Sequence, residues 1–240
     1  MADEKEYICS QTQKRLIRDI TDLFKNPLTD NGIYYQHDDN NMLKGYAMII
    51  GPDDSLYKHG FYFFEFNFPT NYPQSPPIVR SITNDGFTRF HPNLYKNGKV
   101  CLSILNTWRG EGWTSCLTIK TVLLTLVSIL DNKPLLHEPG ITEKNIDFEK
   151  YSKIIEYKNL SHSFLDYITI HSIPIKFILF IPIMKQYALK HKNEILTFIK
   201  NKAIEQTNPI MVETSIYRIK TNIDWNNLYM NIQIAYSELK

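Results

Sequence analysis

The chain has 240 residues, of which 43% are hydrophobic and 22% are charged. This length and composition are typical of one globular domain, or of one domain with a substantial extension. The formal net charge of +2 is too small to indicate a nucleic-acid partner.

The first predicted element is a helix near the N-terminus. Residues 1–10 are charged and lack the apolar segment of a secretory signal. Further along, Asn26 and Pro27 form a helix stop. Between these points, apolar residues recur at the spacing of one helical face: Leu16, Ile17, Ile20, Leu23 and Phe24.

Four strand-like runs follow, with turn residues and no helix between them: residues 32–37, 44–52, 60–68 and 77–83. In the third run, Phe64 and Phe66 point to one side of a strand, and Glu65 and Asn67 point to the other. Such a series predicts an antiparallel meander. Residues 68–77 contain four prolines, which remove backbone donors and fix φ, so we expect an ordered extended loop there.

Helices are expected in most of the remaining chain. Thr118 is the expected N-cap of a helix whose apolar residues repeat at helical spacing from Ile119 to Leu130. Further helices are expected at residues 148–160, 184–202 and 225–239. The most apolar run, residues 173–184, is too short and too rich in proline to span a membrane as a helix.

The predicted fold class is therefore α+β. Residues 1–145 are expected to form a core domain with an N-terminal helix, a four-stranded antiparallel meander sheet, an irregular segment and a central helix. Residues 146–240 are expected to form a helical C-terminal extension, either packed on the core or appended to it. The extension would either cover apolar surface of the core or present a binding site. The sequence does not decide between these two roles.

Three cysteines occur, Cys9, Cys101 and Cys116, too few for a disulfide framework and at spacings that match no zinc site. We therefore expect an intracellular protein, cytoplasmic or nuclear, without a metal. Cys116 precedes a predicted helix, whose dipole lowers a thiol pKa. Cys101 follows the Asn97-Gly98 turn in an apolar run, which is typical of a buried strand thiol. Spacing alone does not identify a functional cysteine.

Several separated motifs occur in an order that is specific. Residues 51–79 contain a Gly-Pro turn, an aromatic strand and a Tyr-Pro-x-x-Pro-Pro loop, and the His-Pro-Asn motif at 91–93 lies shortly before Cys101. Over roughly residues 7–140, this order resembles the ubiquitin-conjugating enzyme family. The CLSIL segment, the tryptophan-bearing insert after it and HEPG most resemble the large branch of that family, whose members carry C-terminal helices.

The resemblance implies a catalytic role for three residues. Cys101 would accept the C-terminus of ubiquitin as a thioester, and the amide of Asn93 would stabilise the oxyanion when that thioester is attacked. His91 and Pro92 would hold the loop. His137 stands where many family members have an aspartate, and there it would either accept a proton from the substrate lysine or be a spectator.

The resemblance also implies docking residues. Lys14 and Arg15 match the basic face of the first helix that meets the activating enzyme and ligases. Phe68 matches the apolar loop residue that ligases contact, although it would equally suit the core. Thr114 and Ser115 lie in the second ligase-facing loop, which also contains the third cysteine.

The expected partners are ubiquitin or a ubiquitin-like protein, the activating enzyme, a ubiquitin ligase and substrate lysines, with no membrane. No bound cofactor is expected, because the activating enzyme uses the ATP. One alternative is a catalytically silent interaction module of the same fold, which the presence of both Cys101 and Asn93 disfavours. A less favoured alternative is a cysteine hydrolase that pairs Cys101 with His91 or His137.

Overall fold

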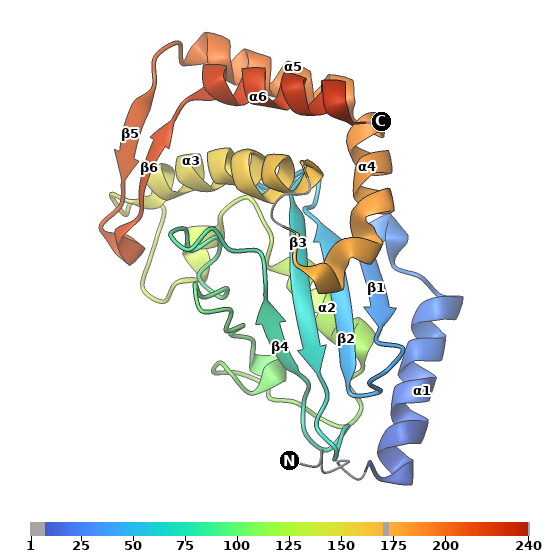
Figure 1. Ribbon diagram of the computed structural model, residues 1–240. Helices are drawn as coiled ribbons and strands as arrows, with labels where there is room; N and C mark the ends of the chain where they lie inside the picture. Colours follow the sequence, from blue (N-terminus) through green and yellow to red (C-terminus); the bar gives the residue numbers. More distant parts are fainter. Residues whose placement is uncertain (1–7, 170–172, 240) are drawn as a thin grey trace, which may run out of the picture.

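The computed structural model describes residues 8–169 and 173–239. The chain forms a four-stranded antiparallel sheet between two layers of helices, and a small hairpin stands at one side (Figure 1). The elements, in chain order, are α1 (Ser10–Lys25), β1 (Ile33–His37), β2 (Lys44–Ile50), β3 (Phe61–Asn67), β4 (Ile78–Ser81), α2 (Ile119–Ser128), α3 (Phe148–Lys158), α4 (Ile181–Lys190), α5 (Lys192–Glu205), β5 (Ile210–Glu213), β6 (Lys220–Ile223) and α6 (Trp225–Glu238).

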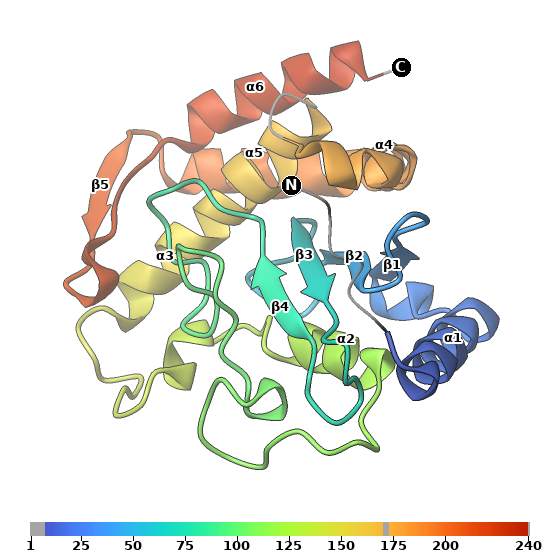
Figure 2. The ribbon, with the colours of Figure 1, turned by 60° about the horizontal axis from the view of Figure 1, so that its bottom comes forward.

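The main sheet has the strand order β1-β2-β3-β4, so the predicted antiparallel meander is confirmed. The predicted N-cap of α2 is also confirmed, because the Thr118 side chain accepts from the Thr121 amide, and the Thr121 side chain accepts from the Thr118 amide in return. Figure 2 shows α2 below the sheet and the helices of the C-terminal extension above it. The sheet is therefore covered on both faces.

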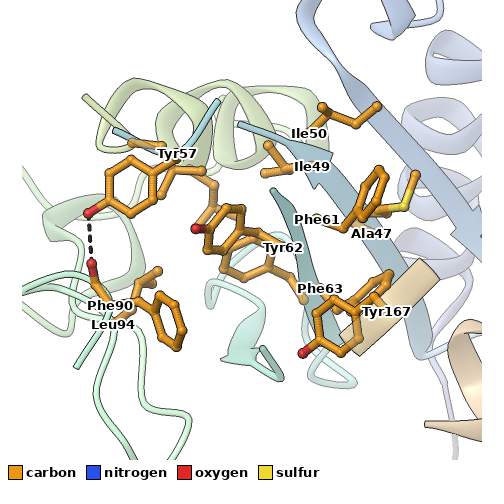
Figure 3. Close-up of a cluster of buried hydrophobic side chains, with 14 of the residues drawn as sticks. Ala47, Ile49, Ile50, Tyr57, Phe61, Tyr62, Phe63, Phe90, Leu94 and Tyr167 are labelled. Atoms are coloured by element: carbon orange, nitrogen blue, oxygen red, sulfur yellow. Dashed lines mark hydrogen bonds between the residues drawn. The ribbon is translucent and has the colours of Figure 1, made fainter. Parts of the chain in front are cut away.

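The face of β3 that bears Glu65 is covered by the extension. The ring of Phe61 stacks on Phe164, with centroids 5.7 Å apart, and the ring of Phe63 meets Tyr167 edge-on at 4.9 Å. Figure 3 shows Phe63 and Tyr167 side by side in this cluster. Burying one such side chain contributes about 1.5–3 kcal/mol. The extension is therefore a structural layer of the protein, packed on the core.

The apolar run at residues 173–184 belongs to this layer. It forms a 3₁₀ segment, Ile175–Phe180, and the start of α4. Phe177 and Phe180 are buried, and the ring of Phe177 lies 4.9 Å from that of Phe63. Within residues 8–169 and 173–239, no helix combines the length and the apolarity needed to cross a membrane.

The extension is not entirely helical, which corrects the predicted layout. A two-stranded sheet, β5–β6, lies between α5 and α6. Each strand has only four residues, and no glycine or asparagine turn signal stands between them. The turn contains no glycine. Instead, Tyr217 and Arg218 adopt left-handed φ values of 58° and 50°. The helix predicted at 184–202 is also divided, into α4 and α5 at His191.

Helix α1 buries only part of the face that its apolar spacing predicts, since Leu16 and Leu23 are buried and Ile20 packs partly buried against the core. Ile17 and Phe24 are 53% and 71% exposed. The buried face combines two leucines with polar residues: Thr12, Arg15, Leu16, Asp19 and Leu23. Arg15 and Asp19 are buried as a pair, since the guanidinium Nε lies 2.9 Å from a carboxylate oxygen.

Candidate active site

The loop around Cys101 folds back on itself at the Asn97-Gly98 turn. Gly98 has a φ of 85° and donates its amide to the carbonyl of Tyr95 at 2.8 Å. Past the turn, the Cys101 amide donates to the Asn93 carbonyl at 2.9 Å. The side-chain Nδ2 of Asn93 donates to the Cys101 carbonyl at 2.6 Å. The two residues are therefore hydrogen-bonded in both directions, across the turn that separates them.

The side chain of Cys101 is only 1% exposed, as expected for a thiol in an apolar run. It lies just past an isolated bridge between Leu94 and Val100, outside the named strands. A groove of about 450 Å³ adjoins this segment, and Val100 and Leu105 help to line it, but Cys101 does not. Cys116 is exposed, and Cys9 accepts the Thr12 amide at the start of α1. A bond to another protein at Cys101 therefore requires the segments around it to open.

His91 and Pro92 hold the loop. His91 is fully buried, and its Nδ1 accepts the amide of Asn93 at 3.0 Å. Burial, and then the neighbouring His137 ring, lower the pKa of His91 well below its usual value, so the imidazole is neutral. Pro92 is buried, and its carbonyl accepts from the guanidinium of Arg89.

No histidine in the described part of the chain forms a hydrogen bond to the Cys101 sulfur. The nitrogen of His91 that faces the loop is occupied by the Asn93 amide, at 3.0 Å. A cysteine hydrolase needs its histidine against the thiol. The arrangement therefore gives no support to the hydrolase alternative.

His137 ends a 3₁₀ turn, Pro134–His137, beside the His91 ring, with centroids 4.8 Å apart. Its Nε2 lies 2.8 Å from Oδ2 of Asp131, and the side chains of His137 and Asp131 are 31% and 40% exposed. The carboxylate orients the imidazole. Asp131 is not among the site residues predicted from the sequence, although its position directly after the central helix was an available signal.

The predicted docking residues differ in exposure. Lys14, Thr114 and Ser115 are exposed. Arg15 is buried, and its guanidinium donates to the Ser115 carbonyl at 2.6 Å and to a second carbonyl, that of Leu117. The Arg15 side chain therefore holds the second loop against α1, and it does not form part of an exposed basic face.

Phe68 is 4% exposed, which corrects its expected position on the surface. Its ring meets Tyr72 edge-on at 5.3 Å and stacks on Phe66 at 6.2 Å. The alternative that Phe68 belongs to the core is confirmed. The proline-rich loop that follows is fixed by Trp113, whose indole donates to the Pro73 carbonyl at 2.7 Å.

One cluster outside the loop carries the side chains that metal ions accept. Nitrogen and oxygen atoms of His59, His191 and Glu194 lie within 4.8 Å of one another. However, the Lys58 ammonium lies 2.6 Å from Oε1 of Glu194 and already supplies the positive charge. His59 Nδ1 lies 2.9 Å from the Tyr187 hydroxyl. The cluster therefore joins the core to the extension through hydrogen bonds and ion pairs.

Comparisons with known proteins cover up to about two thirds of the chain. A family model described as "Ubiquitin-conjugating enzyme" matches residues 15–158. The ubiquitin-conjugating enzyme E2 Z of Danio rerio is 38% identical over 160 residues, which cover 65% of this chain and 48% of that protein. The human E2 Z is 37% identical over 158 residues, covering 65% of this chain and 44% of that protein. The chain thus spans about half the length of these relatives.

Two further proteins are similar over shorter stretches. The human dual E2 ubiquitin-conjugating enzyme/E3 ubiquitin-protein ligase BIRC6 is 46% identical over 100 residues, covering 39% of this chain and 2% of that protein. The solved structure of human ubiquitin-conjugating enzyme E2 G1 has 33% identity and a TM-score of 0.45, covering 52% of this chain and 98% of that chain.

Proposed function

Because this chain belongs to the ubiquitin-conjugating enzyme family, we propose that it carries ubiquitin, or a related modifier, on Cys101 and transfers it to a substrate lysine. The Cys101 thiolate attacks the thioester carbonyl on the activating enzyme, whose own thiolate leaves. A lysine amine then attacks the new thioester, the Cys101 thiolate leaves and the amine loses a proton. A thiolate suits both steps, because it is a good nucleophile and a good leaving group.

The partners in this proposal are the modifier, the activating enzyme, a ubiquitin ligase and the substrate protein. The chain itself needs no metal or organic cofactor, because the activating enzyme consumes the ATP. The exposed Lys14, Thr114 and Ser115 are the residues that we assign to partner contacts. The reaction takes place inside the cell, in the cytoplasm or the nucleus.

The observation that carries the proposal is the pairing of Asn93 with Cys101. Nδ2 of Asn93 lies 2.6 Å from the carbonyl oxygen of the residue that bears the thiol. In the proposal, the same side-chain amide donates to the oxyanion that forms on the former carbonyl oxygen of the thioester, whose carbon is bonded to that sulfur. An oxyanion donor of this kind accelerates acyl transfer by about 10²–10³-fold.

His137 is the proposed proton acceptor for the attacking lysine. Asp131, 2.8 Å from His137 Nε2, fixes the orientation of the ring. General bases that are held in this way contribute on the order of 10²-fold or more to a rate.

Charging with ubiquitin tests the proposal. The protein is incubated with activating enzyme, ubiquitin and ATP, and the products are separated on a non-reducing gel. We expect a ubiquitin adduct that is cleaved when a reducing thiol is added. The adduct should be lost in Cys101→Ala and retained in Cys116→Ala and in Cys9→Ala. An adduct that persists in Cys101→Ala would overturn the assignment.

The burial of Cys101 favours one alternative, a silent interaction module of the same fold, because a thiol that is 1% exposed is protected from partners. The two functions differ in the same assay. A silent module forms no adduct with any activating enzyme, even at high concentration. A cysteine hydrolase, in contrast, would cleave a C-terminal ester of ubiquitin without ATP.

A further inference from the structure

The turn between β5 and β6 has a conformation that its residues disfavour. Tyr217 and Arg218 have φ values of 58° and 50°, where glycine or asparagine is usual in hairpin turns. Neighbouring contacts hold the turn in place. The Ile216 amide donates to the Asp147 carboxylate at 2.8 Å, and the Thr214 hydroxyl donates to the Ile216 carbonyl at 2.9 Å. Strained residues of this kind persist where the surroundings fix them.

This conformation places the Tyr217 side chain against the core. Its hydroxyl donates to the carboxylate of Glu138, which directly follows His137. Its ring packs on the guanidinium of Arg89, 4.3 Å from the ring centroid. The ring of Tyr95 packs on the same guanidinium at 3.7 Å. Arg89 is thus held between a tyrosine of the extension and a tyrosine of the loop that contains Asn93.

Arg89 passes this support to the His-Pro-Asn motif. Its guanidinium donates to the carbonyl of Pro92, the residue before Asn93. The Arg89 carbonyl accepts from the Tyr151 hydroxyl of α3 at 2.6 Å. A planar guanidinium between two rings has little freedom, so the Pro92 carbonyl has little freedom as well.

We infer that Tyr217 and Arg89 are positioning residues for the transfer step, through which the C-terminal hairpin fixes the peptide that orients Asn93. The inference rests on the proposed function and assigns to the extension a role at the same site. Neither residue needs to touch the modifier or the lysine. Both act by fixing the Pro92 carbonyl. This carbonyl belongs to the peptide that precedes Asn93, and it therefore influences the direction of the Asn93 side-chain amide.

The test separates charging from transfer. For Tyr217→Ala we expect the rate of thioester formation on Cys101 to stay within about twofold, and discharge to free lysine to slow by about tenfold or more. Tyr217→Phe keeps the ring over Arg89 and should retain most of the rate. Arg89→Lys keeps the charge but loses the planar stack, and should be as slow as Tyr217→Ala.

Two controls distinguish positioning from simple destabilisation. Ile232 is a fully buried residue of α6, and Ile232→Ala leaves a cavity beneath that helix. The variant should therefore lower the melting temperature without slowing discharge to lysine. In an Asn93→Ala background, Tyr217→Ala should cause no further slowing, because its effect passes through Asn93.

Two results would overturn the inference. One is an additive loss in the Tyr217→Ala, Asn93→Ala double variant. The other is a slower discharge rate in Ile232→Ala as well as in Tyr217→Ala, in proportion to the loss of melting temperature in each variant. Destabilisation alone would then explain the effect of Tyr217→Ala. Failure of the proposed function is a separate result, since the unsubstituted protein would then form no thioester at all.

Discussion

Asn93 has one polar atom without a partner among the residues that the structure describes. Its Oδ1 is buried and accepts no hydrogen bond from residues 8–169 or 173–239, while its Nδ2 donates to the Cys101 carbonyl. Buried polar atoms without partners are uncommon in folded proteins, and a role in catalysis is one of the explanations for them. The amide is therefore held in one orientation without being fully satisfied, which suits a donor that changes its acceptor during a reaction.

His137 provides a prediction at the scale of one side chain. His137→Ala should slow discharge to lysine by about 10²-fold, because the amine loses its proton acceptor. Discharge to hydroxylamine, which is already neutral at the assay pH, should change little. Single-turnover discharge from the preformed thioester measures both rates.

Asp131→Asn is the matched variant, since it keeps the shape of the residue that orients the ring. Its effect on discharge to lysine should be smaller than that of His137→Ala. Equal loss with both nucleophiles in His137→Ala would show that the residue only supports the loop.

Four of the candidate-site residues that the sequence predicted, His91, Pro92, Asn93 and Cys101, lie in one short segment, and His137 lies outside it. The His-Pro-Asn segment and Cys101 are separated only by a turn, so their pairing follows from local structure. Arg89 and Tyr217 were missed because only the complete fold brings them together. The burial of Arg15 and Phe68 could not be predicted from the sequence either, because it depends on which elements cover these side chains.

At the scale of elements, Arg15 connects α1 to the loop that begins at Trp113. Its side chain is buried against Asp19 and donates to the Ser115 and Leu117 carbonyls. Arg15→Ala should lower the free energy of unfolding by about 3 kcal/mol, because it leaves the buried Asp19 carboxylate with only the Tyr72 hydroxyl and the more distant Arg18 guanidinium. Urea unfolding measures the change.

Lys14 is the natural control, because it is exposed on the same helix. Lys14→Ala should change the free energy of unfolding by less than about 0.5 kcal/mol. It should instead slow charging by the activating enzyme, if that helix face docks there. A large stability loss in Lys14→Ala, or none in Arg15→Ala, would contradict this division of roles.

Elements with long, regular patterns were predictable. The four strands and α2 lie within the predicted runs, because alternation and helical spacing continue over enough residues to be recognised. The β5–β6 hairpin was not predictable, since its turn contains Tyr217 and Arg218 where a hairpin signal requires glycine or asparagine. Tertiary contacts to Asp147 and Glu138 replace that local preference.

At the scale of the whole molecule, the extension and the core are joined at a cluster that responds to pH. Burial lowers the pKa of His59 to about 4, although Glu194 acts in the opposite direction. The other groups that face His59 are Lys58, Asp53, His191 and the Tyr187 hydroxyl. The unfolded chain binds a proton at His59 near its usual pKa of about 6.5, whereas the folded chain does not.

Stability should therefore fall as the pH is lowered from 6.5 towards 4, where the unfolded state binds more protons than the folded state. At pH 5 the loss from His59 alone is roughly 2 kcal/mol, from 1.5 pH units at 1.36 kcal/mol each. Urea unfolding at pH 7.5 and pH 5 measures this difference. The buried His91 adds a loss of the same sign, because its pKa is lowered as well.

His59→Phe isolates the contribution of His59. The variant should lose less stability between pH 7.5 and pH 5 than the unsubstituted protein, because only His91 and weaker groups still titrate. An unchanged difference between the two pH values would show that His59 titrates normally in the folded protein.

The contact between Arg89 and Tyr217 also sets an order of events during synthesis. The peptide that bears Asn93 and Cys101 leaves the ribosome long before the hairpin that supports it. A nascent chain, or one released early by a premature stop, would contain the thiol but lack the support of its loop. Under the proposed function, chains that end before the hairpin would then pass the modifier on less efficiently than chains that include it.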